Sequence, residues 1–223
     1  GSTQLYFIAM AWLVFELSGS PLDLGLLGVS MAVPTIAATL VGGILADRLN
    51  RRSILLTTTA VAAVLLLLLA ALDVTGVVRV WHVLVVSGLL GLVHGFDFPA
   101  RSSIFPALIQ PHQMMSAVAL NSSIWQGTRI IAPAIGGVLI AVIDTGAAFV
   151  LAAVLMFVFT IVVAFLKVPD EARAGASARK ASAFGDIVEG LKFIKANSVF
   201  SFLIGMTFFN SFFGMAYISM MPA

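Results

Sequence analysis

The sequence has no cysteine and little charge, and each absence limits what the protein can be. Without cysteine, the chain has neither a disulfide framework nor a thiolate metal site. Only 10% of the residues are charged whereas 61% are hydrophobic, which excludes an ordinary soluble domain of this length. The sequence also contains no phosphate-binding loop, no metal-binding cluster and no hydrolase triad. We therefore expect a protein that is not an enzyme, has no cofactor or metal, and is not a self-contained ATP-driven pump.

Long apolar runs recur along the whole chain. They exceed the ~18 residues that mark a membrane-spanning helix, so we expect an all-α, multi-pass membrane protein. The first run is short for a complete span, and we interpret it as the truncated first helix of a longer protein. The runs predict helices at about 1–17, 24–46, 54–72, 81–104, 115–143, 147–166 and 199–223.

Basic residues are distributed unevenly over this arrangement. Of the 12 lysines and arginines, all but Arg79 and Arg129 fall at one end of the predicted helices or in the polar stretch 167–197. Because cytoplasmic loops carry an excess of Lys and Arg, this end and this stretch are predicted to be cytoplasmic. The stretch reads as a linker, with an amphipathic surface helix over Phe184–Asn197. Since the basic residues orient the chain, we expect no nucleic-acid partner.

One short segment joins two apolar runs almost without a spacer. Residues 43–52 read GILADRLNRR. The pattern resembles the signature loop of the major facilitator superfamily, G-x-x-x-D-R/K-x-G-R/K-R/K, which joins the second and third helices of those transporters. Asn50 stands where the family prefers Gly, and because Asn tolerates left-handed backbone angles, the turn is expected to survive. The resemblance implies an inner gate formed by Gly43, Asp47, Arg48, Arg51 and Arg52.

The fifth predicted helix carries a second motif. Ala132-Pro133-Ala134-Ile135-Gly136-Gly137 resembles the G-P-x-x-G-G motif of drug:proton antiporters, with Ala132 in place of the first Gly. Small residues there predict close helix packing. Together with WLVFELSGSP near the start, the resemblance covers nearly the whole chain. It points to the branch that contains macrolide efflux pumps and siderophore exporters.

The resemblance implies a major facilitator fold. This chain would supply a six-helix N-terminal bundle (1–166), a cytoplasmic linker (167–197) and the first helix of a second bundle (199–223). Helices two, four and five carry Gly, Pro and polar residues and are expected to line the central cavity. Helices three and six are apolar all round and are expected to face lipid. Aromatic residues of the seventh span either line a binding pocket or face lipid and core.

Polar residues within the spans are candidates for ion coupling or for lining the cavity. They are His94, Asp97, Arg101, Asn121, Arg129 and Asn210. Arg129 falls near the predicted middle of the bilayer, where an arginine costs at least ~2.5 kcal/mol unless it faces protein or water. It is therefore either a cavity charge that binds substrate or biases the transport cycle, or a partner in a helix–helix hydrogen bond.

The fourth predicted helix concentrates three of these candidates. Asp97 and Arg101 stand four residues apart and are well placed to pair. In relatives, the loop arginine that corresponds to Arg51 reaches a carboxylate of this helix, and Asp97 is the candidate for it here. His94 is either a coupling group that titrates near neutral pH or a packed residue. Gly91 stands where drug:proton antiporters often carry an arginine, so the resemblance does not extend the usual proton relay to this position.

The resemblance implies a monomeric secondary transporter in a bacterial inner membrane. Its expected partners are a small-molecule substrate, a coupling ion (the proton) and the lipid bilayer. It would export small amphipathic molecules by alternating access. Two alternatives remain: a lipid or lysolipid transporter of the same fold, and a membrane scaffold or receptor-like relative that transports nothing.

Overall fold

The computed structural model describes residues 2–48, 50–107, 109–165, 197, 201–207 and 209. The chain forms two compact units, Gly1–Ala176 and Ser177–Ala223. The described part of the second unit includes a helical segment, residues 201–207, whose side chains are exposed. The predicted linker up to residue 196, most of the seventh predicted span and Asn210 lie outside the described residues.

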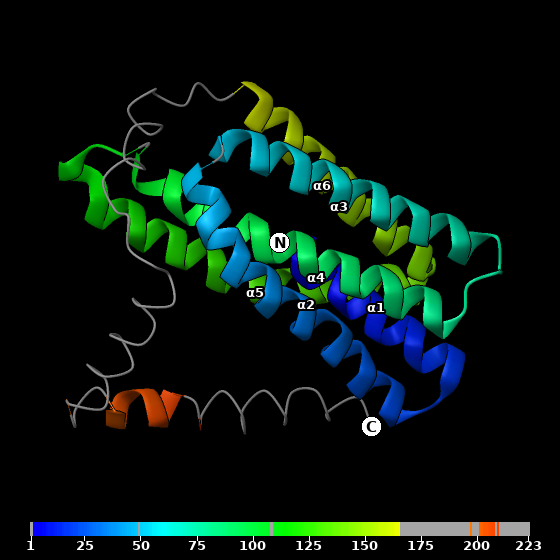
Figure 1. The fold of residues 1–223 in the computed structure, drawn as a ribbon. Coiled ribbons are helices and arrows are strands. Elements are labelled where there is room, and N and C mark those ends of the chain that lie inside the picture. Colours follow the sequence, from blue (N-terminus) through cyan, green and yellow to red (C-terminus); the bar gives the residue numbers. More distant parts are fainter. Residues whose placement is uncertain are drawn as a thin grey trace. The chain divides into compact units, whose positions relative to one another are not determined.

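The described part of the first unit consists of helices joined by short turns, with no strand (Figure 1), which agrees with the all-α class expected from the sequence. Its helices are α1 (Ser2–Ser18), α2 (Pro21–Arg48), α3 (Arg51–Val74), α4 (Val80–Ala107), the short 3-10 helix η1 (Pro111–Gln113), α5 (Met114–Val142) and α6 (Thr145–Phe165). Within the described ranges, the five helices α2 to α6 are long and apolar enough to cross a membrane, whereas α1 has 17 residues. Each predicted range up to residue 166 overlaps one of these helices.

Two glycines lie just beyond helix ends in a left-handed conformation, which a residue without a side chain adopts easily. Gly19 follows α1 with a φ of 62°, and its N–H donates to the Phe15 carbonyl oxygen at 2.7 Å. Gly76 follows α3 with a φ of 69°, and its N–H donates to the Asp73 carbonyl oxygen at 2.9 Å. Both have the left-handed conformation that is typical just beyond a helix C-terminus. These turns reverse the chain toward α2 and α4.

Helices α2 and α4 pack most closely, and small residues make their approach possible. A Cβ on Gly95 would lie 2.5 Å from Cβ of Ala38, and a Cβ on Gly91 would lie well inside contact distance of the Met31 carbonyl oxygen. The Thr35 hydroxyl donates to the Gly91 carbonyl oxygen at 3.0 Å across the same contact. Backbones brought this near are typical of membrane helix pairs that have small residues at the interface.

Helix α3 packs mainly on α6 and also on α4, and α1 fits against α5 and α6. Figure 1 shows α3 (cyan) and α6 (yellow) running side by side. The Thr160 hydroxyl donates to the Thr59 hydroxyl at 2.8 Å across that pair. The main buried cluster joins α1 to these helices through residues such as Met10, Leu66 and Phe149. The bundle is therefore organised around α1, α3, α4 and α6.

The expected lipid-facing role of α3 and α6 describes only one face of each helix. On α3, Leu66 and Leu69 are completely buried while Val64 and Leu67 are exposed. On α6, Phe149 is completely buried while Val158 is exposed. A helix that is apolar all round suits both environments, since one stripe packs on neighbouring helices and the other can meet lipid. Composition alone does not separate the two faces.

Candidate functional site

The two-residue connection between α2 and α3 lies at what we call the hairpin end of the bundle. Asn50 precedes α3 with φ −66° and ψ 110°, and its side-chain oxygen accepts the N–H of Arg52 at 3.1 Å. The backbone there is extended, so the turn forms without the left-handed angles that Asn tolerates. Asn suits the position because its side-chain oxygen caps the N-terminus of α3. Gly has no side chain to make this bond.

Arg52 ties this connection to the end of α6. Its Nε donates to the Val163 carbonyl oxygen at 3.2 Å, and its Nη2 donates to the Ala164 carbonyl oxygen. The last carbonyls of a helix have no partner within the helix and carry a partial negative charge, so a guanidinium is favourable there. Arg52 thus caps α6 from the neighbouring hairpin. The structure does not describe the side chains of the other gate candidates, Gly43, Asp47, Arg48 and Arg51. The gate therefore stays a prediction.

Asp97 and Arg101 form an ion pair within α4. Arg101 Nη2 and Nε lie 2.8 and 3.1 Å from the same Asp97 oxygen, Oδ2. The Thr58 hydroxyl of α3 donates to the other oxygen, Oδ1, at 3.4 Å. The Arg101 guanidinium carbon also lies 4.4 Å from the centre of the Phe159 ring of α6, a cation–π contact. Asp97, which is 9% exposed, is therefore compensated by charge and linked to three helices.

His94 lies near this pair. With Tyr6, Thr58, Asp97 and Arg101 it lines a small cavity of about 20 Å³. Such a volume has room for about one water molecule and none for a drug-sized substrate. His94, Asp97 and Arg101 are thus brought together in a packed polar cluster, and this cluster does not form a substrate pocket.

The arginine missing from α4 has a steric explanation. At Gly91 any side chain would run into the backbone of Met31, because α2 lies directly against this position. An arginine is therefore incompatible with this packing of α2 on α4.

Helix α5 presents its polar residues away from the bundle. Asn121, Gln126 and Arg129 are exposed, and none of them makes a hydrogen bond or ion pair with another described residue. Arg129 is the sixteenth of the 29 residues of α5, counted from Met114, which is close to the middle of the helix. Arg129 was interpreted either as a cavity charge or as a partner in a helix–helix hydrogen bond. No such bond to a described helix is observed.

The glycine motif of α5 has two different environments. Ala132 and Gly136, four residues apart, are both buried, and a Cβ on Gly136 would lie 3.1 Å from the Leu5 side chain of α1. Gly137 has nothing within 4 Å of where its Cβ would be, and it lines a cavity instead. The helix continues unbroken through Pro133. Gly136 thus packs on α1, and Gly137 does not.

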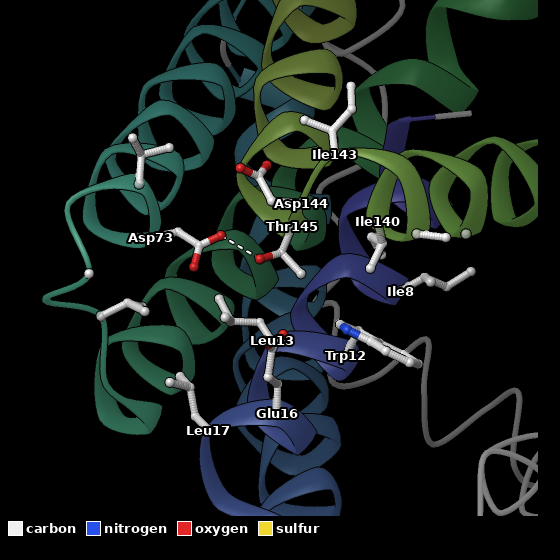
Figure 2. Close-up of a pocket in the computed structure, with 15 residues that line it drawn as sticks. Ile8, Trp12, Leu13, Glu16, Leu17, Asp73, Ile140, Ile143, Asp144 and Thr145 are labelled. Atoms are coloured by element: carbon white, nitrogen blue, oxygen red, sulfur yellow. Dashed lines mark hydrogen bonds between the residues drawn. The ribbon is translucent and has the colours of Figure 1, made fainter.

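That cavity lies at the opposite end of the bundle, which we call the acidic end. Its volume is about 640 Å³, and α1, α3, α5, α6 and the turns beside them line it. Three carboxylates contribute to its wall: Glu16, Asp73 and Asp144 (Figure 2). These three carboxylates were not among the candidates named from the sequence. A signal was available, because each of them stands beside a predicted turn at the end of the helices that has almost no basic residue.

Two of the three carboxylates have structural partners. The Thr145 hydroxyl donates to Asp73 Oδ2 at 2.5 Å, which joins the end of α3 to the start of α6. Asp144 Oδ1 accepts the N–H of Ala147 at 2.6 Å and so caps the N-terminus of α6. Glu16 is exposed and makes no hydrogen bond or ion pair with any described residue. Of the three, Glu16 is therefore available to a ligand.

Comparison with known proteins places these features in context. The chain matches the family described as the Major Facilitator Superfamily over residues 1–223. It is 30% identical over 195 residues to an uncharacterized MFS-type transporter, YfiS, of Bacillus subtilis, covering 86% of this chain and 45% of that protein. No solved structure matches the chain.

Two further relatives have names that describe a function. The multidrug efflux pump Tap of Mycolicibacterium fortuitum is 28% identical over 192 residues, covering 84% of this chain and 47% of the pump. The Staphyloferrin A transporter of Staphylococcus aureus is 24% identical over 171 residues, covering 74% of this chain and 43% of the transporter. The chain therefore spans less than half the length of the curated relatives that it matches. These relatives are transporters and not enzymes.

Proposed function

The chain belongs to the major facilitator superfamily, and we propose that the whole protein is a secondary active exporter of small amphipathic molecules in a bacterial inner membrane. The observation that carries this proposal is the family match over the entire chain together with the efflux and siderophore relatives. The five membrane-length helices support a multi-pass membrane protein. The protein acts as a monomer whose partners are its substrate, the proton and the bilayer.

In this proposal the chain supplies one half of an alternating-access transporter, with the hairpin end in the cytoplasm. Arg52 supports a mechanical role for the hairpin, because it binds the hairpin to the carbonyl end of α6. Any force on the hairpin is thus transmitted directly to α6. The hairpin and the bundle then move as one body when the second half of the transporter rocks against the first.

The coupling ion is the proton in this proposal, and the described contacts favour a packing role for Asp97 and a place in the cavity wall for Arg129. Asp97 is held by Arg101 and Thr58, so its charge serves the packing of α3, α4 and α6. The exposed side of α5 with Arg129 is the better candidate for the cavity wall. An unpaired arginine in the middle of a span is costly in lipid, so this side of α5 meets water or protein in the whole transporter.

Export is tested in cells that lack their own efflux pumps. Cells that make the whole protein are expected to accumulate less of a fluorescent amphipathic dye than cells that make none. An uncoupler should remove the difference, because it collapses the proton gradient. Equal accumulation with and without the protein would contradict export and favour a scaffold. Movement of labelled lysolipid in place of dye would favour a lipid transporter.

The gate is tested at Asp47. Asp47 is the penultimate residue of α2, and in the family the equivalent carboxylate faces the start of a helix in the second bundle when the cytoplasmic side closes. Such a charge-assisted bond is worth ~1.5–3 kcal/mol, so Asp47→Asn should shift the balance toward the inward-facing state by roughly ten- to a hundredfold. Distances between spin labels on the cytoplasmic ends measure the shift. Asp23→Asn, at the acidic end, is the control, and an unchanged distribution in Asp47→Asn would contradict a gating role.

A further inference from the structure

The cavity at the acidic end has the size of a small-molecule site. Its volume of about 640 Å³ falls within the ~300–1,000 Å³ that such sites occupy. The hairpin lies at the opposite end of the helices, since α3 begins at Arg51 and reaches the cavity through Asp73 and Val74. Neither Asp97 nor Arg129 lines it. The cavity is thus separate from the gate and from the polar residues in the spans.

The walls of the cavity differ in chemistry (Figure 2). Ile8, Trp12 and Ile140 contribute an apolar and aromatic side, where α1 meets α5. Asp73, Asp144 and Thr145 stand together on another side, at the junction of α3 and α6. The Trp12 side chain is 51% exposed, so a face of its ring is open to a ligand. A ligand that fills the space meets both an apolar surface and carboxylates.

The charge of the cavity has one sign. No lysine or arginine is among the described residues that line it, so Glu16, Asp73 and Asp144 have no basic neighbour in its wall. Among the described residues, no group of three histidine or acidic side chains is arranged to hold a metal ion. A cation attracted here is therefore held by general charge and by apolar contact, which suits an organic cation better than a metal.

We propose that this cavity binds an amphipathic organic cation. The charged centre lies near Glu16, whose carboxylate has no partner among the described residues, and against the face of Trp12, which attracts cations. The apolar body of the ligand contacts Ile8 and Ile140. This inference does not rest on the proposed export activity, because it requires only that the folded bundle bind the cation.

Binding is tested with tetraphenylphosphonium on the complete protein in lipid nanodiscs. The part of the tryptophan fluorescence change that Trp12→Phe removes reports binding at the cavity, and equilibrium dialysis of the labelled cation gives its affinity. Glu16→Gln should weaken binding about five- to tenfold, as loss of one nearby charge in a half-exposed site does. Asp23→Asn, a carboxylate of the same end that does not line the cavity, should change the affinity less than about twofold.

A second variant acts by filling the space. Gly137 lines the cavity and a Cβ there would meet nothing within 4 Å, so Gly137→Leu should fold and should abolish the Trp12 response. Tetraphenylborate, an anion of the same shape, should not displace the cation. Unchanged binding in both Glu16→Gln and Gly137→Leu would overturn the proposal. Equal displacement by the anion would also overturn it, because the cavity would then be an apolar site without charge selectivity.

Discussion

The two ends of the bundle handle charge in opposite ways. At the hairpin end, Asp97 forms an ion pair with Arg101, and Arg52 donates hydrogen bonds to the carbonyl end of α6. At the acidic end, three carboxylates surround an open cavity of about 640 Å³ and no described basic residue lines it. A carboxylate thus pairs with an arginine at one end, whereas at the other end no described basic residue lines the cavity and Glu16 has no described partner. What separates the two cases is the charge of the partner, because Asp73 and Asp144 accept only from neutral groups, the Thr145 hydroxyl and the Ala147 N–H.

The largest expected loss of stability comes from a steric change and not from a change of charge. It lies between the two ends, where α2 packs on α4. Gly91→Ala places a methyl group against the Met31 carbonyl oxygen, and α2 must then move away from α4. We expect the free energy of unfolding to fall by ~3 kcal/mol, as for other overpacked contacts. Unfolding in mixed micelles of SDS measures the loss.

Gly88→Ala is the matched control for this change. The nearest atom to its added methyl group is the Ser30 carbonyl oxygen at 3.4 Å, an ordinary contact, so little loss is expected. Equal losses at the two glycines would show that close packing at Gly91 does not limit stability.

The comparison becomes sharpest when one carboxylate from each end is neutralised. Asp97→Asn leaves Arg101 without its ion pair, and we expect a loss of ~2 kcal/mol, below the full value for a buried pair because the Arg101 side chain is 44% exposed. Asp73→Asn should cost almost nothing, since its amide oxygen still accepts the Thr145 hydroxyl. The same SDS titration measures both variants.

Replacing both members of the pair checks the cause of that loss. Asp97→Asn combined with Arg101→Leu should recover part of the stability, because no unpaired charge remains. If Asp73→Asn proved as harmful as Asp97→Asn, the contrast between the ends would be refuted.

Arg52→Gln should have the next largest effect. It removes two charge-assisted bonds to α6 carbonyl oxygens, a loss of ~1–2 kcal/mol at this partly exposed position. Arg52→Lys should retain a part, because the charge stays near the helix end. Arg79→Gln is the control at the acidic end, where the exposed side chain makes no hydrogen bond or ion pair with a described residue. Thermal unfolding followed by gel filtration ranks the three, and equal melting points for Arg52→Gln and Arg79→Gln would contradict the capping role.

Glu16→Gln should have the smallest effect on stability. The carboxylate has no described partner to lose, so the free energy of unfolding should change by less than ~0.5 kcal/mol. The same variant should lose affinity for tetraphenylphosphonium. Binding and stability measured on one preparation separate the two effects. A large loss of stability would mean that Glu16 serves the fold and not a ligand.

Much of the fold could be predicted from patterns in the sequence. The helices follow the apolar runs, and the hairpin follows the short basic segment between two of them. The pairing of Asp97 with Arg101 was also predictable, because residues four apart share a helix face. The role of Asn50 was not, since its side chain is equally suited to a left-handed turn and to a helix cap. Only the backbone angle of the folded chain distinguishes them.

The sequence by itself determined that the chain is helical, spans membranes and belongs to its family, because these properties follow from local composition and spacing. The tertiary structure decided which residues meet. It placed Met31 against Gly91 and so excluded an arginine there, and it gathered Glu16, Asp73 and Asp144 from three separate segments around one cavity. Such meetings depend on how helices pack at close range, and in an apolar helix many faces are equally able to pack. Neighbouring backbones and side chains, which no single helix contains, select among those faces.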